Sequence, residues 1–211
     1  MHTEDAAALL FDLGGVVLDI DFERALAAWQ PHSRWPVERL RELFVCDEPF
    51  RHHETGAITD RQYFGHLRGT LGLGCDDAAV EAGWNRIFVA PIVPTLDLID
   101  AVRGRLPCYA LSNTNDAHLR HMQAEFAHVL GRFDRVFVSH EIGHRKPQPQ
   151  SFAHVVQAIG VPAAQVLFFD DLQENVLAAR QSGLQAVLVR GPDDVREALL
   201  ARRLLNAQPL E

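Results

Sequence analysis

Cysteine is scarce in this sequence: Cys46, Cys75 and Cys108 are the three among 211 residues. None of them has a second cysteine at CxxC spacing, and an odd number cannot all pair within one chain. These facts argue against a disulfide framework and against a cysteine zinc site. They favour a reducing compartment, so we expect a cytoplasmic protein.

Long apolar runs are also absent, because no stretch approaches the roughly 20 residues that span a bilayer. Residues 1–5 lack the basic region that begins a signal peptide. Basic charge is low as well: 20 Lys and Arg stand against 28 Asp and Glu, giving a formal net charge of −8. We therefore expect no nucleic-acid or membrane partner, although a small phosphate needs only a local positive site.

Lysine is the scarcest charged residue, since Lys146 is the single lysine and every other basic residue is arginine. Chance can produce this bias, and so can a requirement for an ammonium group at that position. The overall composition is ordinary: 47% hydrophobic and 23% charged residues are typical of a soluble globular protein. The length suits one domain with an insertion, or two modest domains.

Five short, continuously apolar runs predict the buried strands of a parallel sheet. They are Ala8–Phe11, Cys108–Leu111, Val136–Val138, Val166–Phe169 and Ala186–Val189. Helical patterns accompany the later runs, at Pro94–Arg103, Asp116–Phe126, Ser151–Ile159, Asn175–Gln181 and Asp193–Leu205. This alternation predicts an α/β fold with a doubly wound, Rossmann-like parallel sheet.

The stretch from about Ile20 to Ala90 interrupts the alternation. It offers four or five helical segments and no convincing strand, with examples at Phe22–Trp29, Val37–Val45, Asp60–Leu71 and Asp77–Phe88. We therefore predict a core domain of residues 1–19 and 91–211. Residues 20–90 would form a helical domain inserted after the first strand, and the family resemblance described below implies that it is a small four-helix cap domain.

Polar residues follow four of the predicted strands, where ligands bind in open α/β sheets. In chain order they are Asp12, Ser112 with Asn113, Lys146, and Asp170 with Asp171 and Asn175. Carboxylates, an ammonium group and a small hydroxyl suit a divalent cation and a phosphate, and Mg²⁺ prefers such oxygen ligands. Asp12 can act as a nucleophile where cations lower its pKa and neutralise the charge of the phosphate.

Each of these residues also has an alternative, purely structural interpretation. Asp12 can be a turn residue at a strand end, and so can Ser112–Asn113. The pair Asp170–Asp171 can cap the helix that follows it, and Lys146 can be a solvated loop lysine. The four groups together, in order along the chain, favour the functional interpretation.

These motifs resemble those of the haloacid dehalogenase-like hydrolase superfamily over essentially the whole chain. The insertion is similar to the small helical cap of its phosphoglycolate phosphatase and dehalogenase branch. Three segments most resemble sugar-phosphate phosphatases of the α-D-glucose-1-phosphate phosphatase type: Phe11–Phe22 (FDLGGVVLDIDF), Leu111–Asn115 (LSNTN) and Phe168–Asp171 (FFDD).

The resemblance implies a role for each residue that would hold the phosphate. Asp12 would be the nucleophile that forms an aspartyl-phosphate. Ser112 and the backbone amide of Asn113 would hold phosphate oxygens. Lys146 would bridge nucleophile and phosphate and stabilise charge in the transition state.

The same resemblance implies a Mg²⁺ site. Its ligands would be Asp12, the backbone carbonyl of Gly14, and Asp171. Asp170 would bind the ion directly or through a water, and Asn175 would orient the loop or a metal-bound water.

Gly14 departs from the pattern of most phosphatases in this superfamily, which carry an aspartate there as acid and base. A positioned acid–base group is typically worth about 10²–10⁴-fold in rate. Another side chain can replace it, from the flap (Asp19) or the cap (His52, His53 or Glu54). Alternatively, the leaving group departs easily, or the protein is a weak catalyst.

The sequence thus predicts a Mg²⁺-dependent phosphomonoester hydrolase that acts on a small sugar phosphate or similar metabolite. Asp19, His53 and Glu54 are candidate substrate contacts beside Ser112, Asn113 and Lys146. One alternative is a 2-haloacid dehalogenase, in which the same aspartate attacks carbon without a metal. Another is a catalytically weak phosphate-ligand binder or regulatory protein. We expect the protein to be a monomer or a homodimer.

Overall fold

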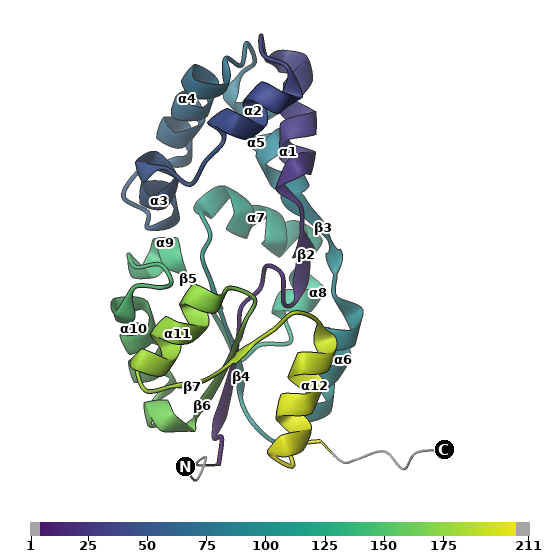
Figure 1. The fold of residues 1–211 in the computed structure, drawn as a ribbon, viewed down its shortest axis with the longest axis vertical. Helices are drawn as coiled ribbons and strands as arrows, with labels where there is room; N and C mark the ends of the chain where they lie inside the picture. The colour runs from purple at the N-terminus through teal and green to yellow at the C-terminus, as the bar shows by residue number, and fades with distance from the viewer. Residues whose placement is uncertain (1–4, 206–211) are drawn as a thin grey trace.

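The computed structural model describes residues 5–205, and its core is a five-stranded parallel sheet. The strands run in the order β5-β4-β1-β6-β7. Their bounds are β1 Ala8–Phe11, β4 Cys108–Ser112, β5 Arg135–Val138, β6 Val166–Asp170 and β7 Gln185–Leu188. All five predicted strands are confirmed, with ends displaced by at most one residue. Figure 1 shows this sheet in one lobe of the molecule and the inserted helices in the other.

The central strands are continuously apolar because helices cover both faces of the sheet. Successive side chains of a strand point to opposite faces, so Leu9 and Phe11 belong to one apolar cluster and Leu10 to the other. Phe11 stacks on Phe169 of the neighbouring strand β6 at 4.8 Å between ring centroids. The doubly wound α/β arrangement is therefore confirmed.

Helices form the two outer layers of the core. Their bounds are α6 Val93–Val102, α7 Asp116–Glu125, α8 Ala127–Leu130, α9 Ser139–Ile142, α10 Pro149–Ile159, α11 Gln173–Gln181 and α12 Pro192–Ala201. Side chains from α6 and α12 pack in the first apolar cluster, and those from α10 and α11 pack in the second. The last helix ends at Ala201, before the predicted Leu205, because Arg203 adopts a left-handed φ of 56°.

The inserted lobe contains five α-helices within residues 22–84. They are α1 Phe22–Trp29, α2 Val37–Leu43, α3 Glu48–Glu54, α4 Asp60–Leu71 and α5 Asp77–Trp84. Helix α3 was not predicted, because the Thr55–Gly56 pair that directly follows it indicated a loop. Asp47 caps it, with a side chain that accepts a hydrogen bond from the amide of Phe50 at 2.9 Å.

The cap has an aromatic core of its own. Trp29 stacks on Trp84 at 6.0 Å and donates its indole hydrogen to the carbonyl of Val80 at 3.0 Å. Tyr63 and Phe64 pack in the same cluster. These large aromatic side chains pack with leucines of the same cluster, such as Leu26 and Leu67, to form the apolar core of the lobe.

Two short strands join the lobes: β2 Leu18–Ile20 pairs with β3 Phe88–Pro91 in antiparallel fashion. The expectation of no strand in residues 20–90 was wrong at this point, because strands of three and four residues carry no readable alternation. The predicted helix Asp77–Phe88 accordingly stops at Trp84 and passes through a 3₁₀ turn, Asn85–Ile87, into β3.

The cap also contacts the core on the opposite side from these strands, where α3 lies beside α9 (Figure 1). Within residues 5–205, no helix combines the length and apolar character needed to cross a membrane.

Candidate active site

The polar residues predicted at the strand ends meet at the carboxyl edge of the sheet. Asp12 directly follows β1, Ser112 is the last residue of β4, and Asp170 is the last residue of β6. Because β1 lies between β4 and β6, these three positions are neighbours. The topology of the sheet therefore brings together residues that are up to 158 positions apart, from 12 to 170.

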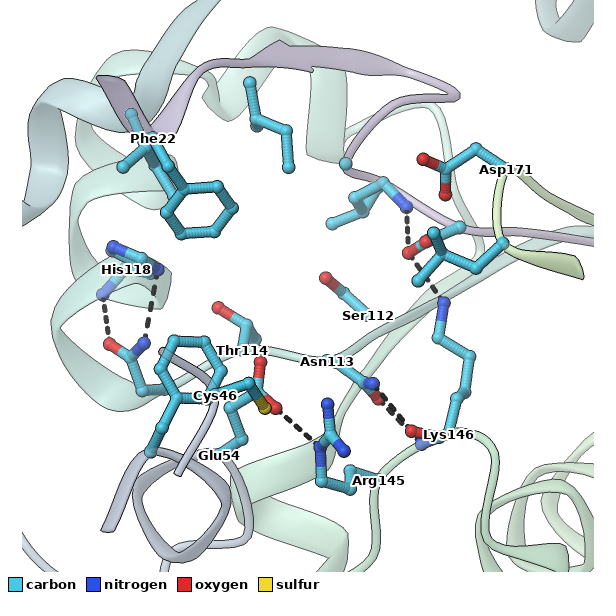
Figure 2. A pocket seen from close by; sticks show the side chains of 18 of the residues that line it. Phe22, Cys46, Glu54, Ser112, Asn113, Thr114, His118, Arg145, Lys146 and Asp171 are labelled. Carbon is cyan, nitrogen blue, oxygen red and sulfur yellow. Dashed lines mark hydrogen bonds and ion pairs between the residues drawn. The ribbon is translucent and has the colours of Figure 1, made fainter. Parts of the chain in front are cut away.

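Lys146 is 1% exposed and lies between two carboxylates. Its Nζ is 2.8 Å from Asp12 Oδ1 and 2.7 Å from Asp170 Oδ2 (Figure 2). Burial alone would lower the pKa of this lysine, but the two carboxylates outweigh burial and raise the pKa above its usual value. Lys146 is therefore a charged ammonium group held against the proposed nucleophile.

Asp12 is also buried, and the amide of Leu13 donates a second hydrogen bond to its Oδ1 at 2.7 Å. Burial raises the pKa of Asp12; Lys146 opposes this rise, whereas Asp170 and Asp171 add to it. One ammonium thus stands against three carboxylates. The surplus negative charge favours a bound cation.

A set of ligand atoms for such a cation is present. One carboxylate oxygen each from Asp12, Asp170 and Asp171 lies within 4.8 Å of the others. Asp171 Oδ1 is buried and has no hydrogen-bond partner, which is unfavourable for a carboxylate unless a cation binds it. The residues present therefore fit a hard divalent ion with oxygen ligands.

Asp170 differs from its neighbours, because both of its oxygens already accept hydrogen bonds. Oδ1 accepts from the amide of Leu172 and from Asn175 Nδ2, each at 2.9 Å, and Oδ2 accepts from Lys146. This arrangement suits a residue that positions Lys146 and reaches a cation through a water. Asp12 and Asp171 are the freer ligands, and Gly14 lines the same cavity.

Asn113 holds the loop that carries Lys146. Its Nδ2 donates to the carbonyl of Lys146 at 2.9 Å, and its Oδ1 accepts from the amide of Lys146 at 2.7 Å. With its side chain occupied in this way, Asn113 offers a ligand its backbone amide. Both Ser112 and Asn113 line the cavity.

The site opens into a cavity of about 430 Å³ between core and cap (Figure 2). Glu54 from α3 reaches across it and accepts a hydrogen bond from Arg145 Nε at 2.6 Å. Burial raises the pKa of Glu54, and Arg145 opposes the rise. This ion pair joins the cap to the residue that directly precedes Lys146.

Sequence reasoning missed several lining residues, notably His118 on α7. Its Nε2 is 3.2 Å from the carbonyl oxygen of Trp84, and its Nδ1 is 3.2 Å from Asn115 Nδ2. Burial lowers the pKa of His118 to about 3, so the ring is neutral. A hydrogen on Nε2 satisfies both contacts. A lone histidine after Asn115 carries no signal of this kind in the sequence.

Two of the candidate substrate contacts lie away from the cavity. Asp19 is exposed in β2, where it pairs with Ala90. His53 is buried within the cap, where its Nε2 is 2.7 Å from Asp60 Oδ1 and its ring stacks on Tyr63. Among the described residues that were expected to replace an acid at position 14, Glu54 is the one that lines the cavity.

Gly14 itself has little room for a side chain. A Cβ placed there would lie 2.9 Å from Cδ1 of Ile20, a residue that also lines the cavity. A side chain at position 14 would therefore require the end of the Ile20 side chain to move.

Comparison with known proteins identifies the family of this chain. A family model described as haloacid dehalogenase-like hydrolase matches residues 6–183. D-ribitol-5-phosphate phosphatase from Bacteroides thetaiotaomicron is 24% identical, over 90% of this chain and 95% of the relative. Sesquiterpene phosphatase astK from Aspergillus oryzae is 29% identical, over 84% of this chain and 86% of the relative.

A solved structure extends the likeness to the fold. A HAD-family enzyme from Bacteroides thetaiotaomicron, in complex with magnesium and inorganic phosphate, superposes with a TM-score of 0.78 at 27% identity. The match covers 88% of this chain and 95% of that one.

Proposed function

The chain belongs to the haloacid dehalogenase-like hydrolase family and is a hydrolase of the phosphatase kind, and we propose that it removes phosphate from a small phosphorylated metabolite in two steps through Asp12. One observation carries the proposal. Lys146 lies between Asp12 and Asp170, and the unpartnered oxygen of Asp171 lies beside them. This arrangement offers a nucleophile, a cation for the phosphate and a metal ligand in one place.

In the first step, a carboxylate oxygen of Asp12 attacks phosphorus. An oxygen–phosphorus bond forms, the ester P–O bond breaks, and its electron pair leaves with the alcohol oxygen. Lys146 and the amide of Leu13 hold Oδ1 and thereby fix the orientation of the carboxylate. In the second step, water attacks the aspartyl-phosphate and releases inorganic phosphate and free Asp12.

Mg²⁺ is the cofactor we propose, bound by Asp12, Asp171 and the carbonyl of Gly14. When bound, it would neutralise phosphate charge and lower the pKa of Asp12. Ser112 and the Asn113 amide would hold phosphate oxygens opposite Lys146. The presence of magnesium and inorganic phosphate in the related bacterial structure supports this assignment.

The alcohol that leaves needs a proton, and Gly14 cannot supply one. Glu54 is the cap side chain we assign to this task, because it faces the cavity and burial raises its pKa. Glu54→Gln keeps an acceptor for Arg145 but removes the proton. For alkyl phosphates we expect its kcat/KM to fall by about 10²-fold or more. Acetyl phosphate, whose leaving group needs no acid, should be hydrolysed within a few-fold of the wild-type rate.

The proposal is tested by release of inorganic phosphate from acetyl phosphate and a panel of sugar and alkyl phosphates. We expect turnover that requires Mg²⁺ and disappears in Asp12→Asn, while circular dichroism shows the variant folded. Trp35→Ala, a change on the cap surface, is the control and should keep full activity.

Four results would contradict the proposal. Turnover that survives in EDTA rules out the metal, and turnover that survives Asp12→Asn rules out the nucleophile. Chloride release from 2-chloropropionate, without phosphate release from any ester, would point instead to a dehalogenase. Tight phosphate-ligand binding with no turnover would point to a binding protein.

A further inference from the structure

The cavity has two chemically different halves. Figure 2 shows Phe22 and His118 on the side opposite Lys146 and Asp171. The half away from Asp12 is lined largely by apolar side chains from the cap, from β3 and from α7. They are Phe22, Phe50, Trp84, Ile87, Phe88 and Met122. The leaving group of a phosphate ester held at Asp12 must extend into this half.

Two apolar side chains that line the cavity are open to solvent: Phe22 of this half, and Leu172, which directly follows Asp171. Phe22 at the start of α1 is 37% exposed, and Leu172 in the loop after β6 is 48% exposed. One comes from the cap and the other from the core. Large apolar side chains left exposed at a cavity are typical of a surface that binds an apolar group.

Several polar groups of this half are bonded to one another. Glu54 is paired with Arg145. The side-chain amide of Asn115 is hydrogen-bonded to the ring and to the backbone N–H of His118. The neutral ring of His118 uses its second nitrogen on the carbonyl of Trp84. Glu54 retains one oxygen for the ester oxygen, which every phosphate monoester carries.

Apart from the terminal nitrogens of Arg145, few buried partners therefore remain for additional hydroxyl groups. Among the described residues lining this half, Thr114 Oγ1 and Trp84 Nε1 are the buried side-chain atoms without a hydrogen bond. A sugar or polyol would give up several hydrogen bonds to water on entering and regain few of them. Sites of this kind discriminate against polar groups that they cannot pair.

We propose that this half of the cavity selects an apolar, unsaturated leaving group, so that the preferred substrates are phosphate monoesters of aryl-substituted or prenyl alcohols. This inference rests on the proposed phosphatase activity and names its substrate class. It differs from the sugar phosphate expected from the sequence. A single hydroxyl or carbonyl on the substrate would find Thr114.

The test compares esters of primary alcohols, so that leaving-group reactivity stays nearly constant. Geranyl phosphate and 2-(1-naphthyl)ethyl phosphate are the apolar probes, and D-ribitol 5-phosphate is the polar one. We expect kcat/KM for at least one apolar probe to exceed that for ribitol 5-phosphate by about tenfold or more. The two apolar probes distinguish a prenyl from an aryl group.

Phe22→Ala removes part of the apolar wall, and Trp35→Ala is its matched control. Both aromatic side chains belong to the cap and are 37% exposed, but Trp35 does not line the cavity. We expect Phe22→Ala to lower kcat/KM for the favoured apolar probe by about tenfold. Trp35→Ala should leave the turnover of this probe and of acetyl phosphate unchanged.

Equal or better turnover of ribitol 5-phosphate would overturn the inference, and so would an apolar preference unaffected by Phe22→Ala. Acetyl phosphate separates these outcomes from failure of the proposed function. If its hydrolysis requires Mg²⁺ and Asp12, the phosphatase stands whatever the leaving group. If no phosphate ester or acyl phosphate is hydrolysed, both proposals fall.

Discussion

Lys146 occupies a position where an ammonium and a guanidinium are not equivalent. It is a compact charge, fully buried, with Asp12 and Asp170 both within 2.8 Å of Nζ. A planar guanidinium is larger and presents its donors in a fixed fork. The single lysine of an arginine-rich chain thus lies where the geometry demands one.

We expect Lys146→Arg to lower kcat by about 10²-fold or more although the charge is kept, because the phosphate loses a correctly placed donor. Acetyl phosphate hydrolysis measures the effect. Arg190→Lys, at an exposed ion pair with Asp194, is the control and should be neutral. Near wild-type activity of Lys146→Arg would show that charge alone suffices.

Gly15 illustrates how closely the backbone approaches the proposed metal ligands. Its φ is +75°, and a Cβ there would lie 2.4 Å from Asp171 Oδ2. Gly143 has the same φ, but a Cβ there would meet open space. The two glycines therefore separate backbone strain from collision with Asp171.

We expect Gly143→Ala to lower the free energy of unfolding by about 1–2 kcal/mol, the strain of a left-handed residue. Gly15→Ala should lower it further and should also weaken Mg²⁺ binding, since Asp171 must move. Urea unfolding and Mg²⁺ titration measure the two effects. Equal losses in both variants, with unchanged Mg²⁺ affinity, would contradict this account.

At the scale of elements, helix α7 ties the core to the cap through His118. The ring stacks on Trp84 at 4.4 Å and contacts the carbonyl of the same residue. Burial lowers the pKa of His118 to about 3, whereas an unfolded histidine titrates near 6.5. The unfolded chain therefore binds the extra proton between these values, and stability rises with pH across this window.

Lowering the pH from 6.5 to 5 should cost about 2 kcal/mol of the free energy of unfolding through His118. In His118→Gln, which lacks a titrating ring, this part of the pH dependence should vanish. Urea unfolding at the two pH values, on both proteins, gives the difference. Identical pH dependence in the two proteins would mean that His118 is not buried as a neutral ring.

The elements show which parts of the structure a sequence can reveal. The five main strands were predicted because each is a continuous apolar run, and β1 and β6 are buried throughout. Strands β2 and β3 were not predicted. Each is stabilised by pairing with the other, about 70 residues away, and neither has a periodic pattern.

The candidate site likewise has a part that the sequence could predict and a part that it could not. Asp12, Ser112 and Asp170 could be placed together because parallel strands end at one edge of the sheet. The contact between Glu54 and Arg145 spans 91 positions and depends on how the cap sits against the core. Glu54 was one of several cap candidates, but nothing local in the sequence marks its pairing with Arg145. His53, a candidate next to Glu54 in the sequence, points instead toward Asp60.

For the molecule as a whole, the proposed metal should act as a stabiliser. The carboxylates of Asp12, Asp170 and Asp171 repel one another in the folded state, and the unfolded chain does not hold them together. At a Mg²⁺ concentration 100 times its Kd, linkage predicts about 2.7 kcal/mol of added stability.

We expect the thermal midpoint to rise on addition of Mg²⁺ and to fall back with EDTA. Asp171→Asn should remove most of this rise. It should also raise the midpoint in EDTA, because one of the clustered charges is gone. Asp97→Asn, on helix α6 outside the carboxylate cluster, is the control. A Mg²⁺ response that persists in Asp171→Asn would place the ion elsewhere.

The antiparallel pairing of β2 with β3 puts the entry and the exit of the cap side by side, with Leu18 opposite Pro91. The inserted helices form a separate apolar cluster around Trp29 and Trp84. The cap is therefore an insertion with an apolar core of its own, joined to the sheet domain through the β2–β3 ribbon. Exchanging it for the cap of a relative would need two chain junctions, both on this ribbon. The exchange should redirect substrate choice and would also replace Glu54, the acid we propose, whereas Asp12 and Lys146 would stay in the core.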